Sequence, residues 1–188
     1  MKLSVLSLLL AATTAYARTD YTTNFDKLER GKLTPNPLRE LLYSDEFQIG
    51  TYAVQASNAN AKSKKLLFSG PGAVGKRSGR IKISPESKED RFTLKKAQLG
   101  CSGKKTGGKK KTVPCELEIT GMRPSQNFVS RTVKYTDTKS LLTLNDLEDD
   151  LWGLYSVSFK VVSAGKGGDL KEDVTLLVDS LEYYVGDE

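Results

Sequence analysis

Apolar and polar residues alternate along most of this chain, and this pattern constrains the fold more than any other feature of the sequence. It is clearest at 153–162, where Tyr155, Val157, Phe159 and Val161 share one face. Neighbouring side chains on a strand point to opposite faces, so alternation over such lengths predicts half-buried antiparallel strands. Segments of this kind, or short apolar runs ended by turn residues, lie at 47–56, 66–70, 80–84, 91–100, 116–120, 128–136, 153–162 and 173–185.

Only two segments carry helix signals, and neither is long enough to form a core helix. Residues 37–45 place Pro37 at a first helical position, and 144–152 are compatible with another short turn. Eight or more predicted strands and no long helix indicate an all-β fold class. We expect a single-domain, antiparallel β-sandwich, jelly-roll-like, with one or two short helical turns.

One predicted strand, 91–100, departs from strict alternation. Phe92 and Leu94 lie two residues apart on one face, whereas Ala97 and Leu99 share that face only after a shift at 95–96. A slip of one residue exchanges the two faces of a strand, so we expect the register to change there.

The first 17 residues, MKLSVLSLLLAATTAYA, have the three parts of a secretory signal. Lys2 provides the positive start, an apolar stretch follows, and Ala15 and Ala17 are small residues of the kind that signal peptidase requires. The domains predicted are a signal peptide at 1–17 and one β-sandwich domain at 18–188. Removing 17 of the 188 residues leaves 171, enough for one hydrophobic core. No apolar stretch is long enough to span a bilayer, so we expect a secreted protein without a membrane span.

The chain has two cysteines, Cys101 and Cys115, and strand-like segments lead into the first and out of the second. In a protein with an export signal, one pair of cysteines predicts one disulfide. We expect this bond to clamp the ends of a hairpin loop and to serve chiefly as a structural staple.

The loop between the cysteines is rich in lysine, and basic residues crowd the wider region 62–111. Such a surface attracts anionic partners, although a solvated run of charge has the same composition. No aromatic residue is interleaved with the lysines, and secretion is expected, so nucleic acid is not an expected partner. The candidate partner-binding residues are Lys104, Lys105, Lys109, Lys110 and Lys111 in the loop, with Lys76, Arg77 and Arg80 nearby.

The chain contains no histidine, which removes the commonest general base and the commonest metal ligand. With both cysteines oxidised, neither a Cys–His nucleophile pair nor a Cys/His zinc site can form. We therefore expect no enzymatic activity, no catalytic residue, no cofactor and no metal centre. If Ca²⁺ were bound, Asp26 and Asp179, on the expected first and last strands, would be the candidate oxygen ligands.

Six short motifs follow one another along the chain. They are NFDKL (24–28), TPNP (34–37), FTLKKAQLGC (92–101), PCELEITGM (114–122), LWGLYSVSFKV (151–161) and LLVDSLEYY (176–184). In this order they resemble a widespread group of small secreted fungal proteins, some of which are effectors. The resemblance implies a jelly roll like that of carbohydrate-binding modules and a secreted fungal origin. It implies no catalytic residues, and the lysine-rich loop departs from the pattern of the group.

These features predict a monomeric, secreted, effector-like fungal protein that acts without catalysis in the host apoplast or at the host–fungus interface. Its partner would be a host extracellular protein. One example is a defence hydrolase such as a papain-like cysteine protease, inhibited by loops that cover its cleft. The alternative is a module that binds cell-wall polysaccharide, including anionic glycans. That alternative predicts retention on insoluble glucan, chitin or pectin.

Overall fold

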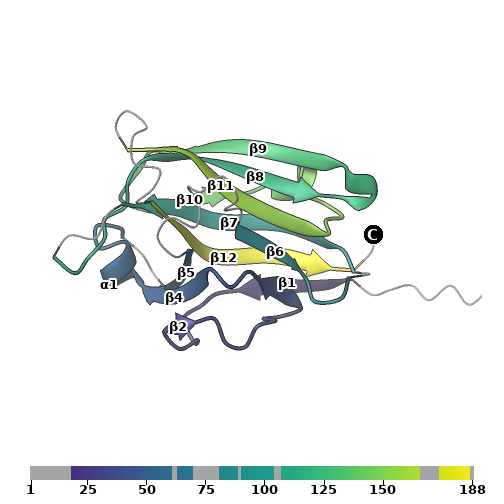
Figure 1. Ribbon diagram of the computed structural model, residues 1–188, viewed down its shortest axis with the longest axis horizontal. Helices are drawn as coiled ribbons and strands as arrows, with labels where there is room; N and C mark the ends of the chain where they lie inside the picture. The colour runs from purple at the N-terminus through teal and green to yellow at the C-terminus, as the bar shows by residue number, and fades with distance from the viewer. Residues whose placement is uncertain are drawn as a thin grey trace, which may run out of the picture.

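Two antiparallel β-sheets pack face to face in the computed structural model, which describes residues 18–60, 63–69, 81–88, 90–103, 107–165 and 174–186 (Figure 1). Within these ranges the first sheet has seven strands, in the order β10 (Leu142–Leu144), β7 (Phe92–Ser102), β12 (Thr175–Val185), β5 (Lys65–Ser69), β4 (Phe47–Thr51) and β2 (Gly31–Lys32), with β1 (Thr19–Thr23) also paired to β12. The second has five, in the order β3 (Leu41–Tyr43), β6 (Ile81–Pro85), β11 (Ser156–Ala164), β8 (Cys115–Met122) and β9 (Phe128–Tyr135).

Successive strands pass repeatedly from one sheet to the other. Strand β5 lies in the seven-stranded sheet and β6 in the five-stranded one. Strand β7 returns to the seven-stranded sheet, and β8 and β9 both lie in the five-stranded sheet. Strands β10 and β12 then lie in the seven-stranded sheet, and β11, between them in sequence, lies in the five-stranded sheet. This connectivity confirms the predicted all-β, jelly-roll-like sandwich.

The main hydrophobic core lies between the sheets and follows the alternation in the sequence. Phe92, Leu94, Ala97 and Leu99 of β7 are all buried there. The predicted change of register is also present, because Glu182 of β12 pairs with Lys96 while Tyr183 pairs with Leu94. On β11, Val157, Phe159 and Val161 are buried as predicted.

Tyr155 does not belong to this inward-facing series. Strand β11 begins only at Ser156, and the preceding Leu154 takes the buried position by pairing with Phe92. Tyr155 is half-buried, and the Arg91 guanidinium lies 3.5 Å from the centroid of its ring. The prediction that Tyr155 faces the core is therefore wrong.

The helix predicted at 37–45 is absent from the structure of that segment. Asn36 donates from Nδ2 to the carbonyl of Tyr43 (2.8 Å) and accepts from its N–H (3.0 Å), which closes a loop instead. Arg39 and Glu40 have positive φ, and β3 occupies 41–43. The helical turn at 144–152 is confirmed as a 3₁₀ turn, η2 (Leu147–Asp149), and a second, η1, covers Pro124–Gln126.

A short helix replaces the end of the strand predicted at 47–56. Strand β4 ends at Thr51, and α1 (Tyr52–Gln55) follows directly. The four-residue α1 and the turn after it cover part of the outer face of the seven-stranded sheet, meaning the face turned away from the five-stranded one. None of the helices in the described ranges is long and apolar enough to cross a membrane.

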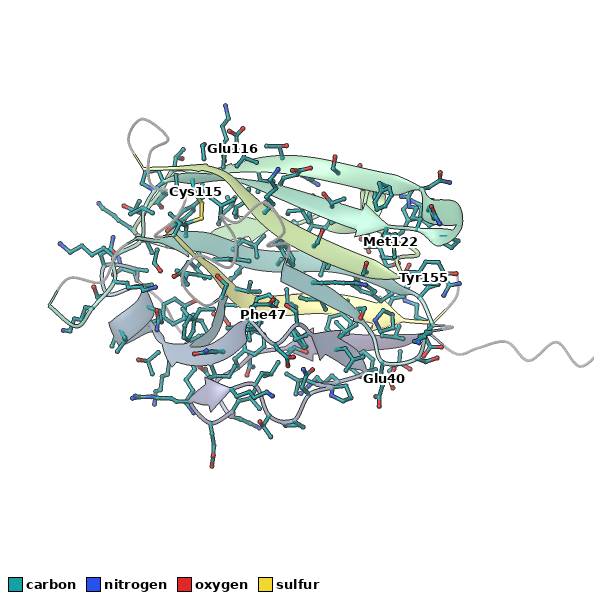
Figure 2. The ribbon with its side chains drawn as sticks, in the orientation of Figure 1. Glu40, Phe47, Cys115, Glu116, Met122 and Tyr155 are labelled. Carbon is teal, nitrogen blue, oxygen red and sulfur yellow. A yellow bond between two sulfur atoms is a disulfide. The ribbon has the colours of Figure 1, made fainter. Side chains whose placement is uncertain are left out.

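Cys101 and Cys115 form the predicted disulfide at the base of a hairpin loop (Figure 2), because Ser102 pairs with Thr112 and the Val113 N–H donates to the Cys101 carbonyl at 2.9 Å. Beyond this loop, however, the two strands do not pair with each other. Cys101 lies on β7 and Cys115 on β8, and these strands belong to different sheets. The intervening connection therefore crosses from one layer of the sandwich to the other, and the bond joins the two sheets. Both cysteines are buried in the main core.

Candidate functional site

A cavity of about 420 Å³ opens on the outer face of the seven-stranded sheet. On β12, Val178 faces the main core, whereas Leu177 belongs to a separate small cluster with Tyr52 on the outer face. Asp179 follows the same alternation and points outward with Leu177. The residues that line the cavity are Tyr52, Asn60, Ser63, Gln98, Ser140, Leu141, Thr143, Asp179 and Ser180.

Strand β12 is irregular at the point where it enters the cavity. Its register shifts between Asp179 and Glu182, and Ser180 has a φ of 45°, in the left-handed region. On the same edge, β12 pairs with β5 before this irregularity and with β1 after it. Such irregularities re-aim side chains. Here Asp179 is left only 2% exposed although it lies on the outer face.

The Asp179 carboxylate is held by neutral donors. The Tyr52 hydroxyl donates to Oδ2 at 2.8 Å, and the Ser180 N–H donates to Oδ1 at 2.8 Å. Burial raises the pKa of Asp179, and the charge of Asp26 acts in the same direction, while hydrogen bonds from Tyr52, Ser63 and Ser180 oppose the rise. Burial and the Asp179 charge raise the pKa of Tyr52, so Tyr52 remains a phenol donor at neutral pH.

Three polar side chains cross the floor of the cavity in one row. Thr143 of β10 pairs with Gln98 of β7, and Gln98 pairs with Asp179 of β12. Gln98 Nε2 lies 3.5 Å from the Thr143 hydroxyl. Leu141 forms part of the wall by packing over Gly100, where an added Cβ would lie 2.7 Å from Leu141 Cδ2. Glycine at this position therefore lets the wall approach the sheet.

Asp26 has a structural role at the edge of this site. It lies in the turn after β1, so its predicted place on the first strand is wrong, although β1 and β12 are neighbours as expected. Its Oδ1 accepts the N–H groups of Lys64 (2.8 Å) and Lys65 (2.9 Å) at the start of β5. These bonds account for its position without Ca²⁺. Among the described residues, no group of three or more His, Cys, Asp or Glu side chains gathers to hold a metal ion.

The structure places the candidate lysines differently from one another. Lys109 and Lys111 are exposed, but Lys110 is only 7% exposed, which corrects its assignment to a contact surface. Its N–H donates to the Val54 carbonyl (2.7 Å), and its Nζ donates to the Thr175 hydroxyl. Lys110 thus docks the crossing loop onto α1 and β12. The other candidates, Lys76, Arg77, Arg80, Lys104 and Lys105, lie outside the described residues.

Replacing Lys110 with alanine is expected to lower the free energy of unfolding by about 1–3 kcal/mol, because the Thr175 hydroxyl loses its donor and the aliphatic stem its packing. The measurement is urea denaturation. Lys109→Ala and Lys111→Ala are matched controls on the same loop, expected within about 0.5 kcal/mol of the wild type. Equal effects at all three positions would contradict the docking role of Lys110.

Replacing Asp179 with asparagine is expected to raise the melting temperature at pH 7. A raised pKa in the folded state means that the stability contributed by Asp179 is present below about pH 3.8 and is lost as the pH rises through the folded pKa. Asparagine avoids the buried charge and keeps an acceptor for Tyr52. Thermal melts from pH 3.5 to 7 check this: the two proteins should converge in acid. A variant that is less stable at pH 7 would contradict the burial cost.

Sequence reasoning singled out only one residue of the cavity, Asp179, and for a different role. It was chosen as a possible Ca²⁺ ligand because the first and last strands were expected to be neighbours, although its place directly after the apolar run TLLV is also a signal. Tyr52 lies in a segment predicted as a strand, so its place in a helix over the cavity was not expected. Gln98 and Thr143 are distant in sequence and become neighbours only because their strands pair. These residues become a site because distant segments converge on one sheet face.

No protein-family model and no curated protein matches the chain. Among solved structures it is similar to a DUF4465 family protein from Bacteroides caccae, with a TM-score of 0.45 and 11% identity over 96% of this chain and 97% of that one. It is also similar to the CBM22-1–GH10 modules of Clostridium thermocellum endo-1,4-β-D-xylanase 10B, complexed with xylohexaose. There the TM-score is 0.35 and the identity 7%, over 82% of this chain and 28% of that one. At these values neither likeness bears on function.

Proposed function

We propose that the protein is a non-catalytic carbohydrate-binding protein and that its ligand occupies the cavity on the outer face of the seven-stranded sheet. The observation that carries this proposal is the buried Asp179 carboxylate, in line with Gln98 and Thr143 on the cavity floor. The disulfide is typical of proteins from oxidising compartments, so we place the protein outside the cell.

The composition of the cavity lining suits a polyhydroxylated ligand. A sugar hydroxyl both donates and accepts, and so do the serine, threonine and amide side chains around it. Asp179 adds a charged acceptor beside the neutral ones, and Leu141 adds an apolar contact for C–H groups. A volume of about 420 Å³ falls in the range of small-molecule sites, which is about 300–1,000 Å³.

Binding accounts for this lining better than hydrolysis does. Glycosidases use two carboxyl groups that flank the bond to be cleaved. Among the described residues that line the cavity, Asp179 is the only carboxyl group, and the nearby Asp26 caps β5. We therefore propose recognition without cleavage.

Binding of a host protein through the lysine loop stays a prediction. Of the residues suggested for it, Lys109 and Lys111 are exposed in the described structure, and neither of them lines the cavity on the outer face of the seven-stranded sheet. The cavity, by contrast, is a formed site with a buried charge. This difference favours the carbohydrate reading over the effector reading.

Titration calorimetry against a panel of neutral, amino and acidic oligosaccharides tests the proposal. Gln98→Ala and Thr143→Ala should each weaken the binding of the saccharide that binds, by about tenfold for a lost hydrogen bond left unpaired in the site. Phe128→Ala, on the exposed start of β9, is the control and should bind as the wild type does. No binding to any saccharide, or unaltered binding in both floor variants, would refute the proposal.

A further inference from the structure

We infer that the cavity selects a sugar that carries a protonated amine, such as a hexosamine, over neutral and acidic sugars. This inference rests on the proposed function and names its ligand class. It begins from the surroundings of Asp179, which is 2% exposed and accepts hydrogen bonds from Tyr52, Ser63 and Ser180. All of these donors are neutral.

The part of the lining that the structure describes contains no lysine or arginine to neutralise this carboxylate. A charged carboxylate that is buried without a cationic partner is unfavourable, because no ion pair offsets the free energy lost on removing it from water. A ligand cation at Asp179 would supply the missing charge.

A second carboxylate reinforces the preference for positive charge. Asp26 lies close enough for its charge to act on Asp179, although its Oδ1 is bonded to backbone N–H groups. The side chain of Lys65, which follows, is directed elsewhere, since its Nζ donates to the Leu28 carbonyl. Lys64 is exposed. The two carboxylates thus attract a cation and repel a uronate.

The chemistry of an ammonium group fits this position. It offers three donors, and its bonds to a carboxylate are charge-assisted and stronger than those of a sugar hydroxyl. The Tyr52 hydroxyl and the Ser180 N–H would keep their bonds to Asp179, while the amine replaces the neutral hydroxyl donors of Ser63 and Ser180, the latter 3.5 Å from Oδ1. An N-acetyl group removes the charge and adds bulk, so acetylation should abolish the preference.

The test compares glucosamine, N-acetylglucosamine, glucose and glucuronate, and their short oligomers where available, by titration calorimetry at pH 6.5 and low salt. The amine form should bind about tenfold tighter than the neutral form, as expected when a hydrogen bond becomes charge-assisted. Salt should weaken the preference. Asp179→Asn should remove it, whereas Asp45→Asn, an exposed carboxylate outside the lining, should retain it.

Acidity provides an independent readout in the same experiment. The titratable groups that face Asp179 in the described structure are Tyr52 from α1 and Asp26 from the turn after β1. Tyr52 stays protonated throughout, so amine affinity should fall on acidification as Asp179 takes up a proton, and this fall should be absent in Asp179→Asn. Equal binding of glucosamine and glucose would overturn the inference and leave the proposed function standing. A preference that persists in Asp179→Asn would overturn it too, and failure of every saccharide to bind would remove both proposals.

Discussion

Replacing both cysteines, as Cys101→Ala with Cys115→Ala, is expected to lower the free energy of unfolding by about 3 kcal/mol. The two residues are 14 apart in sequence, and their bond closes a loop that the unfolded chain would otherwise leave open. Alanine introduces no polar group into the core, where both cysteines are buried. The loss should exceed that of any surface substitution, because the bond also joins strands from opposite sheets.

Urea denaturation of the wild type and the double variant measures this difference. Wild-type protein unfolded under reducing conditions is the matched control, and its midpoint should move to that of the variant. Coincident curves for the oxidised wild type and the variant would show that the crosslink does not stabilise the sandwich.

Replacing Phe159 with alanine is expected to cost about 3–5 kcal/mol of unfolding free energy. Phe159 lies in the middle of β11, is 0% exposed and packs in the core between the two sheets. Truncation removes the burial of a ring and leaves a cavity that the surrounding strands fill only in part. An effect of this size would leave a domain of ordinary stability barely folded.

The same sheet provides the control for this substitution. Phe128 begins β9 and is 62% exposed, so Phe128→Ala should change stability by less than about 0.5 kcal/mol. Both variants are compared by denaturant unfolding with a common slope. Similar losses for the two phenylalanines would mean that the core does not lie where the structure places it.

The alternation in the sequence determined the strands and their buried faces, but not the sheets to which the strands belong. The irregularity at 95–96 could be predicted because hydrophobic side chains must remain inside the sandwich. Strands β7 and β8, in contrast, were expected to pair along their length because they flank a short loop, but only the residues at the base of the loop do so. Each strand has a buried face whether it pairs with the other or lies in the opposite sheet, so alternation does not distinguish these arrangements.

The candidate site was predictable only where burial left a local signal. Asp179 is recognisable in the sequence because it is a charged residue in an otherwise apolar strand. The residues of α1 have the composition of a strand, so the helix could not be recognised. That helix is one turn long, and its first N–H bonds outside the helix, to the carbonyl of Lys64 at 3.3 Å. Lys110 is flanked by two lysines that are exposed, and no property of the sequence separates the three. Tertiary contacts decide each of these cases.

The loop between the cysteines connects the disulfide with the cavity through a chain of contacts. The disulfide joins the two ends of the loop, the Lys110 N–H donates to the carbonyl of Val54 in α1, and Tyr52 of α1 lines the cavity. Thermodynamic coupling is reciprocal, so if reduction of the disulfide displaces Tyr52 and weakens a ligand in the cavity, that ligand makes the disulfide harder to reduce by the same factor. The cavity and the sulfurs would then be linked through the loop although they lie on opposite faces of the seven-stranded sheet.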